Sequence, residues 1–123
     1  MATVTLNADN LKSTIDKGGI VLIDFWAPWC GPCRAFAPTF EDASNKHADI
    51  VFGKVNTDEQ QELAEAFEIR GIPTLMAFRD QVLIVSQAGA VPAPMLEDLI
   101  REIRALDMKE VRAELTKRPV PEA

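Results

Sequence analysis

The segment that most constrains the fold of this chain is the apolar run Ile20–Trp26, which only Asp24 interrupts. A continuous run that is rich in β-branched and aromatic residues is typical of a strand buried on both faces. Such a strand lies inside a sheet that carries helices on both sides. The run is also too short to span a bilayer, because a membrane helix needs about 20 apolar residues.

Strand-like and helix-like patterns alternate along the rest of the chain. The predicted helices carry apolar residues three or four positions apart, on one face. From the N- to the C-terminus we expect strands near 4–6, 20–26, 50–56, 74–78 and 82–85, with core helices around 11–15, 36–43, 63–67 and 96–103. The sequence therefore predicts an α/β fold, with a central mixed sheet of about five strands and helices on both of its faces.

The length and charge of the chain limit its size class and its partners. With 123 residues it fits one domain, and its 47% hydrophobic residues are enough to build a core. The net charge of −6, without a block of Lys or Arg, argues against binding to nucleic acid or to an anionic membrane. The first residues lack the pattern of a signal peptide, so we expect a cytoplasmic protein. We also expect it to be a monomer.

The C-terminal segment predicts a helix of its own beyond the main domain. Asp107 and Glu110 have the spacing of a capping box, which predicts a short helix that starts at about Met108. The prolines near the C-terminus should end this helix and leave a mobile tail. We therefore divide the chain into a domain over 1–106 and an extension over 107–123.

The two cysteines of the chain, Cys30 and Cys33, have C-x-x-C spacing and lie between the central strand and the next predicted helix. A helix N-terminus carries partial positive charge and free N–H groups, and both lower the pKa of a thiol there. Two cysteines in one helical turn can also form a disulfide with each other. We predict dithiol–disulfide exchange, with Cys30 as the exposed nucleophile and Cys33 as the shielded thiol that resolves the mixed disulfide.

Two other interpretations of this cysteine pair have less support. A zinc site needs four ligands, and the chain offers one histidine besides the cysteines. This residue, His47, we expect to be solvated at the end of a helix, and we predict no metal site. A purely structural disulfide would close a very short loop, so it would constrain the unfolded chain little.

Four motifs, in order and spacing, match one known family. They are Asp24–Cys33 with its Trp-Cys-Gly-Pro-Cys core, 54–56, 71–74 and 88–90. With them the chain resembles the bacterial thioredoxins from about residue 2 to residue 106. The resemblance implies the thioredoxin fold and a general protein disulfide reductase. Its substrates would be disulfide-containing proteins, and a thioredoxin reductase would supply its electrons from NADPH.

The resemblance also implies roles for residues around the cysteine pair. Asp24 would be a proton relay for Cys33, and Lys54 would pair with Asp24. The bond between Ile72 and Pro73 would be cis, and Trp26 would pack beneath the active site. The residues that would form a flat apolar surface for substrates are Trp29, Gly31, Pro32, Ile72, Pro73, Gly89 and Ala90.

Other sequence features bear on bound cofactors and on alternative activities. No glycine-rich dinucleotide motif is present, so we expect no bound nicotinamide or flavin and only a redox-active disulfide. One alternative is a redox-sensing or scaffold module whose oxidation state regulates a specific partner. A second is an oxidase or isomerase of the same fold, although the Gly-Pro pair between the cysteines argues against it by analogy, since oxidases usually carry a histidine there.

Overall fold

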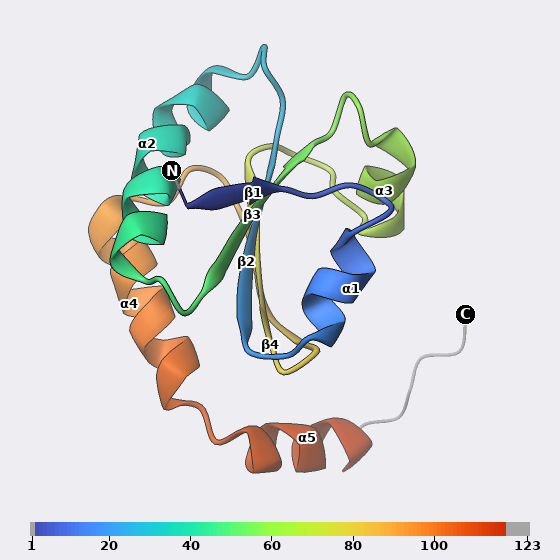
Figure 1. Cartoon of the computed structure of the whole chain (residues 1–123), viewed down its shortest axis with the longest axis vertical. Helices are drawn as coiled ribbons and strands as arrows, with labels where there is room; N and C mark the ends of the chain where they lie inside the picture. Colours follow the sequence, from blue (N-terminus) through green and yellow to red (C-terminus); the bar gives the residue numbers. More distant parts are fainter. Residues whose placement is uncertain (1, 118–123) are drawn as a thin grey trace.

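The computed structural model of the chain describes residues 2–117 (Figure 1). The predicted mobile tail after the C-terminal helix falls outside this range. In chain order the elements are β1 (Thr3–Thr5), α1 (Leu11–Asp16), β2 (Ile20–Trp26), α2 (Gly31–Lys46), β3 (Val51–Asn56), α3 (Gln61–Ala66), β4 (Thr74–Arg79), β5 (Val82–Ala88), α4 (Ala93–Ala105) and α5 (Met108–Lys117). The alternation of strands and helices agrees with the sequence pattern.

The strands form one mixed sheet in which β2 is central. Their order is β1-β3-β2-β4-β5; β1, β3 and β2 run parallel, and β4 is antiparallel to both β2 and β5. Helices α2 and α4 cover one face of the sheet, and α1 and α3 cover the other (Figure 1). The predicted α/β fold with a five-stranded mixed sheet is therefore confirmed.

Strand β2 contributes side chains to both hydrophobic layers, as its continuous apolar run predicts. Leu22 packs in the layer beneath α2 and α4. Val21, Ile23 and Phe25 pack in the layer toward α1 and α3. All four side chains are at most 1% exposed. Because both faces of β2 are covered, the strand is a rigid support for the loop that follows its C-terminal end.

The β4–β5 hairpin turns without a glycine. Asp80 and Gln81 both have a left-handed backbone, with φ angles of 50° and 74°, which is uncommon for residues that carry a side chain. Two hydrogen bonds of 2.9 Å stabilise this turn. The Asp80 N–H donates to the Gly19 carbonyl, and the Gly19 N–H donates to the Asp80 carboxylate. The turn is thereby tied to the start of β2.

Helix α5 begins where its capping sequence predicts. The Asp107 carboxylate accepts hydrogen bonds from two backbone N–H groups of the first turn, at 3.0 and 3.3 Å. The Arg79 guanidinium donates to the carbonyls of Ile103 and Leu106, at 2.8 Å each, and so holds the link between α4 and α5 against β4. Neither α5 nor any other helix within residues 2–117 is long and apolar enough to cross a membrane.

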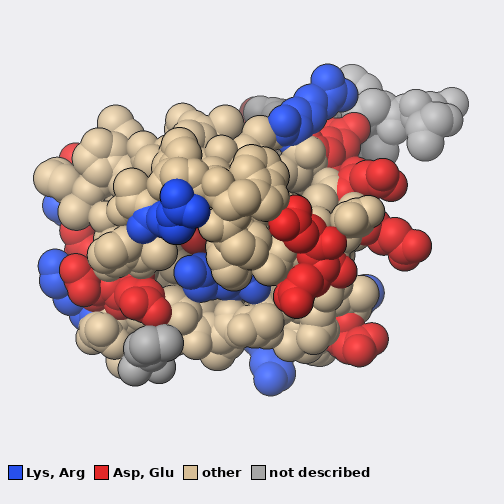
Figure 2. Space-filling model, turned by 90° about the horizontal axis from the view of Figure 1, so that it is seen from above, with Lys and Arg blue, Asp and Glu red and all other residues tan. Residues whose placement is uncertain are grey.

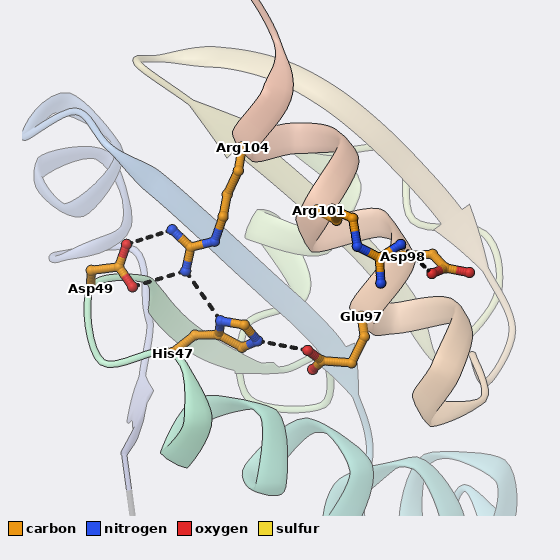
Figure 3. Close-up of polar contacts among 6 residues, drawn as sticks. All are labelled: His47, Asp49, Glu97, Asp98, Arg101 and Arg104. Carbon is orange, nitrogen blue, oxygen red and sulfur yellow. Dashed lines mark hydrogen bonds and ion pairs between the residues drawn. The ribbon is translucent and has the colours of Figure 1, made fainter.

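His47 lies at the end of α2, as expected, but it is only partly exposed, because it lies in a polar cluster between the end of α2 and helix α4 (Figure 3). Its Nε2 is 2.8 Å from the Glu97 carboxylate, and its Nδ1 is 3.1 Å from the Arg104 guanidinium. An arginine can only donate, so Nδ1 accepts and Nε2 carries the hydrogen. Arg104 also donates to both carboxylate oxygens of Asp49, which lowers the pKa of Asp49 to about 2. The cluster joins α2 to α4.

Candidate redox site

The cysteine pair lies at the N-terminus of α2, at one end of the molecule (Figure 1). Cys30 is the residue that caps the helix, and its Sγ accepts a hydrogen bond from the backbone N–H of Cys33 at 3.2 Å. A proline in the first turn, Pro32, removes an N–H that would have no partner there. The two cysteines form a disulfide with a Cα–Cα distance of 5.2 Å. The local sequence thus places a disulfide at the positive end of a helix dipole.

Neither cysteine is open to solvent in this disulfide form. Cys30 is 4% exposed and Cys33 is 2% exposed, because Ala27, Trp26 and Ile72 pack around the pair. The sequence predicted an exposed Cys30, and in this respect the prediction was wrong. A partner therefore approaches the disulfide through the residues that surround it.

Two hydrogen bonds position the loop that precedes Cys30. The Cys30 N–H donates to the Ala27 carbonyl at 3.2 Å, which closes a turn after β2. The Arg34 guanidinium donates to the Pro28 carbonyl at 3.0 Å from the second turn of α2. Arg34 therefore holds the loop and adds positive charge near the cysteines, which favours a thiolate over a thiol.

A second loop, between α3 and β4, faces the disulfide. The bond between Ile72 and Pro73 is cis, as the resemblance implied, and the Ile72 carbonyl oxygen is 3.8 Å from Cys30 Sγ. The Pro73 carbonyl accepts a hydrogen bond of 2.8 Å from the Gly89 N–H. Gly89 has a φ of +95°, which a residue without a side chain adopts at little cost. This contact brings the end of β5 to the same site.

Uncharged residues of the loop at the cysteine pair, of the loop before β4 and of the end of β5 form what we call the uncharged rim. Most of them are exposed, with Trp29 at 67%, whereas Ile72 is only partly exposed and Pro73, which the sequence placed on this surface, is buried. Figure 2 looks onto this end of the molecule, where uncharged atoms cover most of the centre, basic side chains lie among them, and acidic side chains gather on the α3 side. The members of the uncharged rim are Trp29, Gly31, Pro32, Ile72, Gly89 and Ala90.

Trp29 has a partner that the sequence analysis missed. Its indole Nε1–H donates to both carboxylate oxygens of Asp58, at 3.0 and 3.2 Å. The two residues are 29 positions apart, and no local pattern connects them. The acidic stretch around Asp58 carries charge at the start of α3, but Asp58 itself fixes the orientation of Trp29, an exposed residue of the uncharged rim.

Asp24 is buried in β2 without a neutralising contact. It is 0% exposed, and within residues 2–117 neither of its carboxylate oxygens has a hydrogen-bond partner. Burial raises the pKa of Asp24 from 3.8 to about 7, and the positive charge of Lys54 opposes part of this rise. A carboxyl group with a pKa near 7 can accept and release a proton at neutral pH.

Lys54 lies beside Asp24 in the sheet without bonding to it. The two residues are register partners on β2 and β3. The Lys54 ammonium, however, lies 4.8 Å from the centroid of the Trp26 ring, where it makes a cation–π contact. Trp26 packs against the cysteine pair. Lys54 therefore acts on Asp24 through its charge and not through a hydrogen bond.

The residues of this site limit the reactions that it can support. Within residues 2–117, no group of three or more His, Cys, Asp or Glu side chains could hold a metal ion. A disulfide at a helix N-terminus can open by exchange with a dithiol and take up its electron pair, and the dithiol so formed can pass the pair to another disulfide. The fold and the site together define a dithiol–disulfide oxidoreductase.

Similarity to known proteins narrows this class to one family. The thioredoxin family model matches residues 2–102. A putative thioredoxin 2 of Streptomyces coelicolor is 51% identical over 111 residues, which are 90% of this chain and 83% of that protein. Thioredoxin 1 of Synechococcus elongatus is 43% identical over 101 residues, covering 81% of this chain and 94% of the relative. A mutant thioredoxin of Halobacterium salinarum has a similar structure, with a TM-score of 0.78, 32% identity and coverage of 85% and 92%.

The chain belongs to the thioredoxin family. The resemblance that the motifs predicted is thereby confirmed, together with the thioredoxin fold. The protein is a protein-disulfide oxidoreductase that works through the redox-active Cys30–Cys33 disulfide and no bound cofactor.

Proposed function

We propose that the chain is a general protein disulfide reductase that a thioredoxin reductase recharges with electrons from NADPH. The observation that carries this proposal is the position of the Cys30–Cys33 disulfide beneath the uncharged rim. An uncharged surface makes few specific demands on a partner, so it suits many disulfide-containing proteins. We assign the activity to a monomer acting through its domain over 1–106, in the reducing cytoplasm, where a donor of electrons to disulfides has its substrates.

In the proposed cycle, the reduced protein transfers two electrons to a substrate disulfide; Cys33 gives up one proton, and the second proton comes from solvent. The Cys30 thiolate attacks one substrate sulfur; a bond forms between these two atoms, and the S–S bond of the substrate breaks. The Cys33 thiol then loses its proton and attacks the Cys30 sulfur, which releases the second substrate sulfur. The substrate leaves as a dithiol, and Cys30 and Cys33 are left as the disulfide of the present structure.

We assign the proton transfer in the second step to Asp24. Cys33 must be deprotonated to attack, and Asp24 combines burial with a pKa of about 7, so it can take the proton at neutral pH. Lys54 would stabilise the ionised carboxylate through its charge. Trp26 would hold both the ammonium group and the cysteine pair in place.

We assign substrate binding to the uncharged rim and to the backbone beside it. The Ile72 carbonyl lies 3.8 Å from Cys30 Sγ, so an extended substrate segment that pairs with this backbone would bring its disulfide to Cys30. Such pairing uses main-chain groups that every protein has, which is why it tolerates many sequences. Trp29, fixed by Asp58, would cover one side of that segment.

A glutathione redox titration tests the direction of electron flow. The pair is equilibrated with defined ratios of reduced and oxidised glutathione, its thiols are alkylated, and the mass reports the fraction reduced. A reductase keeps its disulfide until glutathione is strongly reducing, because a strong electron donor has a low potential. A pair that is already reduced in mildly oxidising buffer would make the protein an oxidant or an isomerase instead.

A trapping variant distinguishes a general reductase from a regulator of one partner. Cys33→Ser removes the resolving thiol, so mixed disulfides with Cys30 accumulate. A general reductase forms them with many unrelated proteins, and the wild-type protein reduces unrelated disulfide substrates with turnover. A single trapped partner and no turnover would instead support a redox-sensing or scaffold module.

A further inference from the structure

The extension of the chain forms one wall of a groove that the redox cycle does not use. This groove lies between β5 and α5 and has a volume of about 450 Å³. Its lining is apolar apart from two glutamates. The residues that line it are Val82, Leu83, Ile84, Leu106, Glu110, Val111, Glu114 and Leu115.

Helix α5 is held in place, so the groove has two defined walls. The Arg79 guanidinium donates to two backbone carbonyls in the link between α4 and α5. Arg112 of α5 donates to the Asp80 carbonyl in the hairpin turn. Asp107 caps the helix. These bonds fix α5 beside the hairpin, but they do not close it onto β5.

The apolar side chains of the two walls remain exposed. Leu83 on β5 is 48% exposed and Leu115 on α5 is 44% exposed. Full burial of a leucine is worth about 1.5–3 kcal/mol, so a partner that fills the groove gains free energy from both walls. Exposed apolar residues gathered in a concave site mark interaction surfaces, unlike residues scattered singly.

The charge of the groove defines what would bind there. Glu110 and Glu114 are the charged residues of the lining, and they lie four positions apart on one face of α5. The positively charged Arg112 is engaged by the hairpin turn. A partner with Lys or Arg beside its apolar residues therefore matches the groove, whereas an acidic partner would be repelled.

The irregular edge of β5 favours a helix over a strand as the bound segment. The register of β4 and β5 shifts at Ala77 and Phe78, so that Ile84 has no register partner on β4. A bulge of this kind discourages the addition of another strand at that edge. A helix needs no main-chain partner and can place apolar side chains in a groove at intervals of three and four residues.

We propose that the groove between β5 and α5 is a docking site for a basic amphipathic helix of another protein. The groove lies at the end of the molecule opposite the N-terminus of α2 (Figure 1). A protein docked there leaves the Cys30–Cys33 disulfide free to react. The extension would thus tether the oxidoreductase to a partner without blocking its substrates.

A binding assay with synthetic helices tests this proposal on the full chain. The probe is a fluorescent peptide with leucines at helical spacing and lysines on the remaining positions, and its matched control has glutamates in place of the lysines. Fluorescence anisotropy should show binding of the lysine peptide alone, weakened severalfold by high salt because the charges are exposed. No binding of the lysine peptide, or equal binding of both peptides, would overturn the proposal.

Substitutions in the groove, compared with a control substitution elsewhere, test whether the peptide binds in the groove. Leu83→Ser combined with Leu115→Ser should weaken binding of the lysine peptide about tenfold or more, and Glu114→Gln should reduce its salt dependence. Val4→Ser is the matched control, because Val4 is 45% exposed on the opposite edge strand β1. All variants should keep wild-type reduction of disulfide substrates.

Two results with these variants would contradict the docking site. Equal affinity of wild type and the leucine variant would place the peptide elsewhere. A wild-type dimer in sedimentation equilibrium that the leucine variant abolishes would show that the groove serves a second copy of the chain. Peptide binding and reduction of disulfide substrates are measured separately on the same variants. A failure of the docking site can therefore be distinguished from a failure of the proposed reductase function.

Discussion

The substitution Asp24→Asn is the most direct test of the raised pKa of the buried Asp24 carboxyl, because it keeps the size of the side chain and removes its charge. Below about pH 4 the carboxyl is protonated in both the folded and the unfolded chain. Between about pH 4 and pH 7 the unfolded chain releases the proton, whereas the folded chain retains it. The free energy of unfolding of the wild type should therefore fall as the pH rises through this range.

The size of this effect follows from the pKa of Asp24. Its rise from 3.8 to about 7, at about 1.4 kcal/mol for each pH unit, costs the folded chain on the order of 4 kcal/mol above pH 7. About 3 kcal/mol of this cost arises between pH 5 and pH 8. The amide of the variant does not titrate, but its buried N–H groups need partners, which offsets the gain by about 1–3 kcal/mol.

Urea unfolding of the oxidised proteins at pH 5 and pH 8 measures this difference. The variant should be the more stable protein at pH 8, and its advantage over the wild type should grow by about 3 kcal/mol from pH 5 to pH 8. The change in the gap is the decisive quantity, because the cost of the buried amide is the same at both pH values. Parallel pH profiles of the two proteins would refute the raised pKa of Asp24.

The same variant tests the proposed role of Asp24 in resolution. The reduced protein reacts with an aromatic disulfide whose thiolate is coloured. One thiolate leaves when Cys30 attacks, and the second leaves when Cys33 resolves the mixed disulfide. Loss of a general base should slow the second release on the order of 10²-fold at neutral pH and leave the first unchanged. Equal rates of the second release would exclude Asp24 as the proton acceptor.

The remaining predictions concern the rim, the polar cluster and the core. Asp58→Ala should free the Trp29 indole, seen as faster decay of its fluorescence anisotropy; an unchanged decay would mean that packing alone orients the ring. Arg104→Gln should raise the pKa of Asp49 from about 2 toward its ordinary range, as carboxyl NMR titration will report, and a pKa that stays low would point to another cause. Phe40→Ala should cost about 3–5 kcal/mol in urea unfolding, because Phe40 is 0% exposed; a loss below about 1 kcal/mol would contradict close packing there.

The cysteine pair shows how much of the site could be predicted from local sequence. A strand that ends before Cys30 and a helix that starts after it place both sulfurs in one turn, and this geometry depends on a few consecutive residues. The cap of α5 by Asp107 is equally local. Short-range patterns of this kind are set by backbone hydrogen bonding over three or four residues, so they can be read without the rest of the fold.

The accessibility of Cys30 and the contact of Lys54 could not be predicted in this way. Cys30 is shielded because Ile72, from a loop 42 positions later, packs against it. Lys54 lies in the register position beside Asp24, yet its ammonium turns to Trp26. Both outcomes depend on which side chains from other segments compete for the same space in the folded chain. The sequence of a single segment does not specify these neighbours.

The sequence by itself determined the order of elements, the two-sided burial of β2 and the chemistry of the Cys30–Cys33 pair. Only the tertiary structure decided which distant side chains meet, such as Trp29 with Asp58 and the two walls of the groove beside α5. Local hydrogen bonding and the burial of one face of a helix or strand involve residues that are close in the sequence. They therefore leave a periodic pattern in the sequence. Contacts between distant segments depend on strand register and helix packing, which are fixed only when the whole core assembles.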